Sequence, residues 1–228
     1  MNDFIDYSNC AKDSRGVYCV SYSMIEGAVG RYLEKSHPEV LIQPKAIPIE
    51  EWIESGEYGF SLEYRNIAFP VAKGITAFSK MVVGSRDSDS HRLVLVPINQ
   101  NTIVIDESLP ETELRFTCCH EVIHTMAHGY YFVTHANALA ANAYVYYSTF
   151  TNRPIYWLER QADYGAGALM MPKRTVEILF RKITGKSFLY KVYRSSPIRD
   201  ELIKSVQDVY VTSQSAARIR LQQLNLIE

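Results

Sequence analysis

The pattern of apolar and polar residues divides the chain into a helical start, a strand-rich middle and a helical end. Residues 21–34 carry apolar side chains at Met24, Ala28 and Leu33, and this spacing predicts an amphipathic helix. A connector punctuated by prolines follows it. Residues 1–60 match no known motif, so we expect an N-terminal helical extension that carries no functional signature.

The pattern changes to that of strands at Gly74. Residues 75–83 and 93–98 are rich in apolar side chains that favour strands, and a polar turn separates them. A second polar turn leads into residues 102–106. Because the connections are short, these segments predict a three-stranded antiparallel meander. Such a sheet can receive an extended peptide at its edge, or it can simply form a layer of the core.

The next predicted helix begins soon after Pro110, with Thr112 as its N-cap, and contains the sequence HEVIH at residues 120–124. Two histidines four residues apart lie on one face of a helix, with Glu121 beside them. This geometry allows a helix to bind a zinc ion and to hold a general base over the water on that ion. A pair of buried structural histidines is the alternative, but it leaves Glu121 without a role.

A third ligand is expected from another element, because a catalytic zinc usually takes three protein ligands. Glu159 and Asp163 are four residues apart, just before an apolar run at 166–171. Glu159 is therefore the candidate third ligand. Asp163 can accept a hydrogen bond from the second ring nitrogen of a ligating histidine and so fix its tautomer. The alternative is a solvated acidic face around Arg160.

HExxH followed by ExxxD is the arrangement of the gluzincin metallopeptidases, and three segments resemble one family of such enzymes, the ImmA/IrrE metallopeptidases. Residues 115–124 (RFTCCHEVIH) are similar to the family's RFTLAHELGH. Residues 159–172 are similar to its ExEANxFAxxLLMP, and residues 211–227 to its closing VSxxALRIRLxxLGLI. The resemblance covers roughly the last half of the chain and extends more weakly back to about Gly74.

Three departures from the family pattern concern the two motifs. Val122-Ile123 replaces the usual Leu-Gly, Gly165 stands where Phe is common, and Asp163 replaces Asn. The segment between the motifs is also longer than usual. None of these changes removes a ligand or the base, but the longer segment affects the shape of the cleft and hence the choice of substrate.

The resemblance implies a zinc endopeptidase with an α+β, gluzincin-like fold that is mainly helical, with the small sheet beside the HExxH helix. It implies His120, His124 and Glu159 as zinc ligands, Glu121 as the base and Asp163 behind a ligand. Known members cleave helix-turn-helix repressors, so the expected substrate is a DNA-binding regulatory protein. The alternative is a non-proteolytic, zinc-stabilised protein that sequesters a repressor or toxin partner.

Residues 129–152 contain no Asp, Glu, Lys or Arg and include seven tyrosines and phenylalanines. Buried helix is one interpretation, and a wall of the peptide cleft is the other. In the second case a tyrosine, or His135, is a candidate donor to the oxyanion of the tetrahedral intermediate. His128 lies eight residues from His120, about 12 Å along a helix, which is too far to share one zinc ion with it. We expect it at the helix end or the cleft rim.

Two helices are predicted at the C-terminus. One spans about residues 199–210, and the second opens with Ser213 as its N-cap. This pair resembles a helix-turn-helix unit, in which Arg218 and Arg220 could meet phosphate. The pair carries few positive charges, so packing of the pair against the core is the favoured interpretation.

Composition sets the remaining limits. The 228 residues are 47% hydrophobic, which allows a sizeable core, and the net charge of −1 gives no general attraction to nucleic acid or anionic membrane. The N-terminus lacks the features of a signal peptide, and no apolar run approaches the ~20 residues that span a bilayer. We therefore expect a cytoplasmic protein with a peptidase core at residues 61–198 and a C-terminal segment at 199–228.

Cys118 and Cys119 lack metal-binding spacing and are expected to be buried as small hydrophobes.

Overall fold

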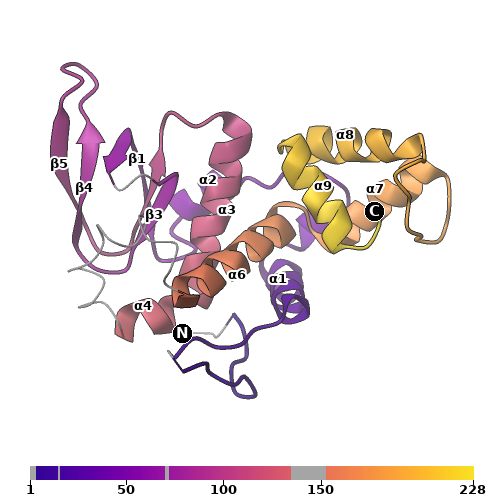
Figure 1. Cartoon of the computed structure of the whole chain (residues 1–228), viewed down its shortest axis with the longest axis horizontal. Helices are drawn as coiled ribbons and strands as arrows, with labels where there is room; N and C mark the ends of the chain where they lie inside the picture. Colours follow the sequence, from indigo (N-terminus) through magenta and orange to yellow (C-terminus); the bar gives the residue numbers. More distant parts are fainter. Residues whose placement is uncertain (1–3, 15, 70–71, 135–152) are drawn as a thin grey trace.

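The computed structural model describes residues 4–14, 16–69, 72–134 and 153–228, and shows an α+β fold (Figure 1). Its helical elements are α1 (Tyr22–Ser36), the 3₁₀ turn η1 (Pro38–Leu41), α2 (Ile49–Glu54), α3 (Glu111–Ala127), α4 (Gly129–Thr134), α6 (Arg153–Met170), α7 (Lys173–Thr184), α8 (Ile198–Tyr210) and α9 (Gln214–Gln223). Its strands are β1 (Ser61–Arg65), β2 (Ile67–Phe69), β3 (Gly74–Ala77), β4 (Met81–Arg86), β5 (Leu93–Ile98) and β6 (Thr102–Asp106).

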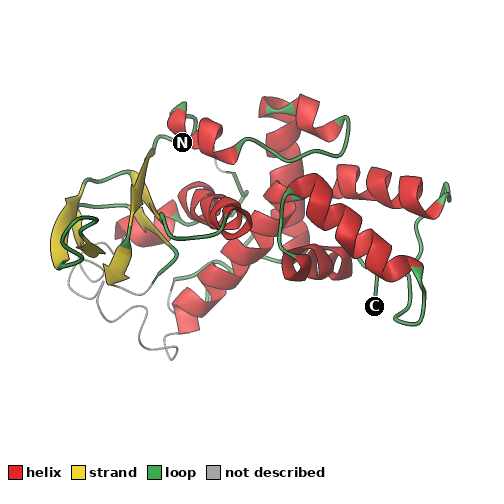
Figure 2. Ribbon diagram, turned by 90° about the horizontal axis from the view of Figure 1, so that it is seen from above, coloured by secondary structure: helices red, strands yellow, loops and turns green. Residues whose placement is uncertain are grey.

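The strands form two three-stranded sheets at one end of the molecule, and α7, α8 and α9 gather at the other (Figures 1 and 2). The first sheet has the order β1-β6-β3 and is mixed, because β1 runs parallel to β6 and β3 runs antiparallel to it. The second sheet has the order β2-β4-β5 and is antiparallel. Helices α3 and α6 lie between the sheets and the C-terminal helices.

The predicted antiparallel meander is therefore wrong in two respects. The segment 75–83 is not one strand but two, β3 and β4, which belong to different sheets. Strand β5 pairs with β4 as predicted, whereas β6 pairs with β1 and β3 instead of β5.

The burial of β6 explains this pairing. Ile103 and Ile105 join the main core on one face, and Val104 packs into the smaller cluster between the sheets on the other. A strand that is buried on both faces is a continuous apolar run, which indicates burial but does not specify which strand is its partner.

The helix that carries HEVIH begins two residues earlier than predicted. Pro110 occupies the N-cap position instead of Thr112, and its side chain makes no capping hydrogen bond. Glu111 and Glu113 lie in the first turn, where a negative charge is favourable at the positive end of the helix dipole. By contrast, the N-terminal helix begins as predicted, because Ser21 accepts a hydrogen bond from the backbone N–H of Met24.

Helices α3 and α6 are in close contact at Ile123 and Gly165. A methyl group at Gly165 would lie 2.9 to 3.0 Å from three side-chain carbon atoms of Ile123, closer than carbon atoms pack. Two of the three departures from the family pattern, at Ile123 and at Gly165, therefore face each other. A large residue on α3 is matched by the absence of a side chain on α6, which keeps the two helices in contact.

The predicted C-terminal helix pair is present as α8 and α9, and Ser213 caps α9 by accepting a hydrogen bond from the backbone N–H of Ala216. Arg220 of α9 is fully buried, and its guanidinium donates to both carboxylate oxygens of Glu26 on α1, at 2.7 and 2.8 Å. It also donates to the backbone oxygen of Met171 at 2.9 Å. Arg220 is thus part of the core and cannot meet phosphate.

Cys118 and Cys119 are buried free thiols, as expected. Among the residues that the structure describes, no helix combines the length and the apolar character that crossing a membrane requires.

Candidate metal centre

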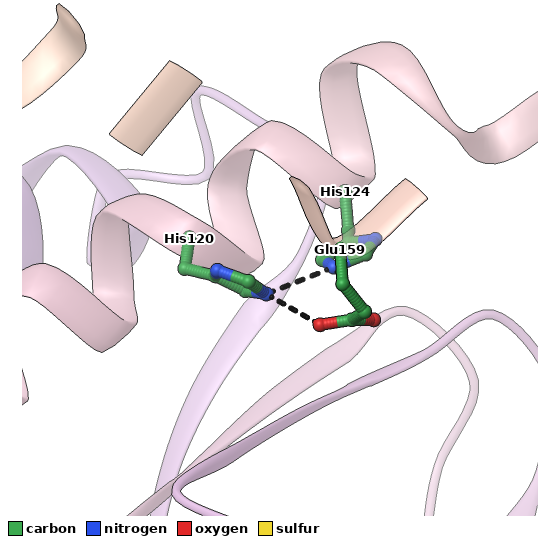
Figure 3. Close-up of side chains that lie close together, drawn as sticks. All are labelled: His120, His124 and Glu159. Atoms are coloured by element: carbon green, nitrogen blue, oxygen red, sulfur yellow. Dashed lines mark hydrogen bonds and ion pairs between the residues drawn. The ribbon is translucent and has the colours of Figure 1, made fainter. Parts of the chain in front are cut away.

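Helices α3 and α6 bring three candidate ligands to one point (Figure 3). His120 and His124 project from α3 one turn apart, and Glu159 projects from α6 toward both. The Nε2 atoms of the two histidines are 3.0 Å apart. The Glu159 carboxylate lies 3.1 Å from His120 Nε2 through Oε2 and 3.4 Å from His124 Nε2 through Oε1.

These separations fit a metal ion. Ligands that bind a tetrahedral zinc at about 2.0–2.1 Å are about 3.3 Å from one another, close to the three distances seen here. Two imidazoles and one carboxylate also form a donor set of catalytic zinc sites, in which the fourth position is left to water or substrate. The residues present therefore fit a metal of this kind.

The electrostatics of the three side chains favour a positive charge between them. Burial lowers the pKa of His120, but its hydrogen bonds to Asp163 and Glu159 outweigh burial and raise the pKa to about 10. Burial raises the pKa of the Glu159 carboxyl, but the adjacent His124 and His120 hold this pKa well below its ordinary value. The Glu159 carboxylate is therefore ionised, and it supplies the negative charge that a bound metal cation requires.

Asp163 lies where the sequence placed it. Its Oδ1 atom is 3.0 Å from Nδ1 of His120, on the side of the ring away from the candidate metal position. Its side chain is 60% exposed, so this hydrogen bond is open to solvent. Asp163 and Glu159 are one turn apart on α6 and contact the two nitrogens of the same imidazole.

His128 has a position that the sequence analysis missed. It ends α3, as expected, through a hydrogen bond from its backbone N–H to the oxygen of His124. Its ring is not at a cleft rim but fully buried, with Nδ1 at 3.0 Å from Nδ1 of His124. On its other side, Nε2 lies 3.2 Å from Oε1 of Gln161 on α6. The i+4 spacing from His124 was the available signal for this contact, whereas the eight-residue separation from His120 excluded only a shared metal ion.

Glu121 lies beneath strand β3. Its carboxylate is buried, and Thr76 donates a hydrogen bond from Oγ1 to Glu121 Oε2 at 2.7 Å. Gly74 makes this approach possible, since a methyl group there would lie 2.6 Å from a carbon of Thr117 and 2.8 Å from Glu121 Oε1. Neither Gly74 nor Thr76 could be identified from sequence, because their contacts with Glu121 span more than 40 residues.

A cleft of about 640 Å³ leads away from this point. It passes Gly74 at the start of β3, Glu113 and Phe116 on α3, and Gly167 on α6, and reaches Ile219 on α9. His120, Glu121, Glu159 and Asp163 also line it. The candidate ligands therefore border a space that is large enough for a short stretch of peptide.

The aromatic segment is described only in part. Residues 129–134 form α4, in which Tyr131 is buried against Val17 and Leu158. The remainder of the segment, including the candidate donor His135, lies outside the described residues.

One comparison with known proteins agrees with the motifs. A model of the peptidase M78 family, described as an IrrE N-terminal-like domain, matches residues 74–197. A search of curated proteins finds no match. Among solved structures, the chain is similar to a Mycobacterium tuberculosis transcriptional regulator, with 12% sequence identity and a TM-score of 0.48. The similarity covers 87% of this chain and 46% of that chain, so this chain spans less than half the length of the regulator.

The family match spans more than half of the chain and contains both halves of the candidate metal centre. This chain belongs to the ImmA/IrrE family, peptidase M78, a family of metallopeptidases.

Proposed function

We propose that this protein is a zinc-dependent endopeptidase. The observation that carries the proposal is the convergence of two imidazole nitrogens and one carboxylate within 4.8 Å of one another, beside a cleft that His120, Glu159 and Glu121 line. Zinc is proposed because this donor set and spacing are those of its catalytic sites.

The roles of the residues follow from their positions. His120, His124 and Glu159 would hold the metal, which when bound acidifies a water molecule and polarises the scissile carbonyl. Glu121 accepts a proton from that water and passes it to the leaving amine. Thr76 donates to one carboxylate oxygen of Glu121 and leaves the other for the proton. Asp163 accepts from Nδ1 of His120 and so directs Nε2 toward the metal.

Strand β3 offers the substrate a place to bind. It pairs with β6 and is the outer strand of its sheet in the part of the chain that the structure describes. Its first residue, Gly74, lines the cleft beside Glu121. An extended peptide that pairs with the free edge of β3 would pass over the general base and the metal.

The proposed substrate is a regulatory protein, in particular a DNA-binding repressor of the helix-turn-helix class. This part of the proposal rests on the family to which the chain belongs, whose known members cleave such repressors. The division of the chain into an N-terminal extension (1–60), a peptidase core (61–198) and a C-terminal segment (199–228) is proposed on the sequence pattern.

The metal is tested first. We expect the wild-type protein to contain one zinc ion per chain by mass spectrometry, and the Glu159→Ala variant to lose it or to bind it much more weakly, because one of three ligands is removed. A wild-type protein that takes up no metal even after zinc is added would contradict the proposal.

The base is tested by Glu121→Gln. We expect this variant to keep its zinc and to lose cleavage, since the amide cannot accept the proton. The rival function, sequestration of a repressor without cleavage, predicts a wild-type protein that binds its partner intact and a Glu121→Gln variant that binds it equally well.

A further inference from the structure

A buried chain of hydrogen bonds leads from the candidate metal centre to the N-terminal segment. His124 contacts His128 through the two Nδ1 atoms at 3.0 Å. His128 contacts Oε1 of Gln161 through Nε2 at 3.2 Å. The amide nitrogen of Gln161 then donates to the backbone oxygen of Tyr18 at 3.3 Å. The chain thus links α3, α6 and the segment that precedes α1.

The donors and acceptors along this chain of hydrogen bonds fit together in only one order. The amide nitrogen of Gln161 must donate to the carbonyl of Tyr18, so its Oε1 is free to accept. Nε2 of His128 therefore carries the hydrogen, and Nδ1 of its neutral ring accepts. Nδ1 of His124 must then donate, so in its neutral form His124 carries no hydrogen on Nε2 and directs that lone pair toward His120 and Glu159.

This arrangement is the one that a metal ligand needs. A neutral imidazole binds a metal through an unprotonated nitrogen, and the partner of its other nitrogen sets the tautomer and the ring orientation. The two middle side chains are also closed to solvent, since His128 is 0% and Gln161 5% exposed. A buried polar group without a partner is costly, so each link holds the next in place.

We propose that His128 and Gln161 are positioning residues that hold His124 in its metal-binding tautomer, with the carbonyl of Tyr18 as the fixed end of the chain. Neither side chain touches the metal. The inference rests on the proposed metal centre, and it adds residues before Gly74, where the family match begins, to the elements that set metal affinity.

The test compares variants of the full chain, stripped of metal and titrated with Zn²⁺ against a chromophoric chelator. His128→Phe keeps a ring but has no acceptor for His124, and we expect it to weaken zinc binding by about 10-fold or more. His128→Gln restores an acceptor oxygen and is expected to recover most of this loss. Gln161→Met removes the next link and is expected to give a smaller loss in the same direction.

A purely structural role for His128 is separated by a second readout and a matched control. Bound Co²⁺ reports ligand geometry through its visible absorption, and we expect His128→Phe to shift this spectrum and His128→Gln to restore it. The control is His37→Phe, which deletes a partly buried imidazole that stacks on Trp52 and hydrogen-bonds to Glu57. We expect it to leave zinc affinity and the Co²⁺ spectrum unchanged even where it lowers the melting temperature.

The outcomes distinguish this inference from the proposed function. Wild-type protein that binds neither metal overturns both. Wild-type protein that binds zinc, with His128→Phe and Gln161→Met each within twofold of it and an unchanged Co²⁺ spectrum, overturns the positioning role alone. If His128→Phe does not fold, the zinc affinity of Gln161→Met relative to wild type decides in either direction.

Discussion

The two histidines of the candidate metal centre are supported in opposite ways. His120 is held by Asp163, a charged group that is 60% exposed at the cleft. His124 is held by His128, an uncharged group that is fully buried and is itself held by Gln161. We call these the open flank (Asp163) and the closed flank (His128 and Gln161). A carboxylate can support a ligand in contact with water, whereas a buried partner needs a complete hydrogen-bond chain.

This comparison shows why one flank was foreseen and the other was not. Asp163 is a carboxylate at helical spacing from a ligand, and its chemistry is visible in the motif. The proposed role of His128 depends on Gln161 and Tyr18, which are 33 and 110 residues away, so spacing within α3 shows only that His128 can reach His124. The pKa of His128 is held well below its ordinary value, because burial and then the nearby His124 oppose a charge there.

The largest expected effect concerns the ion pair between Arg220 of α9 and Glu26 of α1. Arg220 also contacts Met171 at the C-terminal end of α6, the helix that carries Asp163 and Gln161 of the two flanks. Arg220→Met leaves the largely buried carboxylate of Glu26 without its charged partner, and we expect a loss of about 3–5 kcal/mol in the free energy of unfolding, measured by urea denaturation. If the positions of both flanks depend on this contact at the end of α6, the Arg220→Met variant also weakens zinc binding at temperatures where it remains folded.

The same ion pair makes stability depend on pH. Burial raises the pKa of Glu26, but Arg220 outweighs it and lowers the folded-state pKa below the ordinary value of 4.5. Between these two pKa values the unfolded chain binds more protons, so this contribution is fully present above pH 4.5 and is lost as the pH falls through the lowered pKa. Arg220→Met should abolish this acid-dependent loss. An unchanged pH profile of the unfolding free energy in the variant would show that other carboxylates cause it.

The next effect concerns the contact between Ile123 on α3 and Gly165 on α6. Gly165→Ala places a methyl group against Ile123, and we expect the free energy of unfolding to fall by about 1–3 kcal/mol because α3 and α6 must separate. Ile123→Gly alone should also destabilise the protein, by leaving a cavity.

A double-mutant cycle identifies the cause. In Ile123→Gly with Gly165→Phe, the large side chain moves from α3 to α6, and we expect a favourable coupling of about 1–3 kcal/mol in denaturant unfolding. Additive losses would mean that the two positions do not compensate each other.

The smallest effect sharpens the difference between the flanks. Asp163→Ala should weaken zinc binding by about 10-fold at low ionic strength, and Asp163→Asn by less, since the amide oxygen still accepts from His120. Because Asp163 is exposed, the ratio between wild type and Asp163→Ala should shrink as salt is added. The corresponding ratio for His128→Phe should stay constant, and equal salt dependence of the two ratios would remove the distinction between an open and a closed flank.

The sequence alone was sufficient to predict features that depend on positions within one helix. His120 and His124 share a face because the helix has 3.6 residues per turn, and the same periodicity relates Glu159 to Asp163. The candidate ligands, the C-terminal helix pair and the cap at Ser213 could be predicted for this reason. The family was also recognisable, because its motifs are contiguous stretches of residues.

Only the tertiary structure decided what joins residues that are distant in the chain. It divided the predicted strand at 75–83 between two sheets, paired β6 with β1 and β3, and placed Gly74 and Thr76 over Glu121. It also buried Arg220 against Glu26 and joined His124 through His128 and Gln161 to Tyr18. Periodicity shows which face of an element is buried, but the partner on that face is selected by packing of the whole chain, where side-chain volumes and hydrogen bonds must be satisfied together.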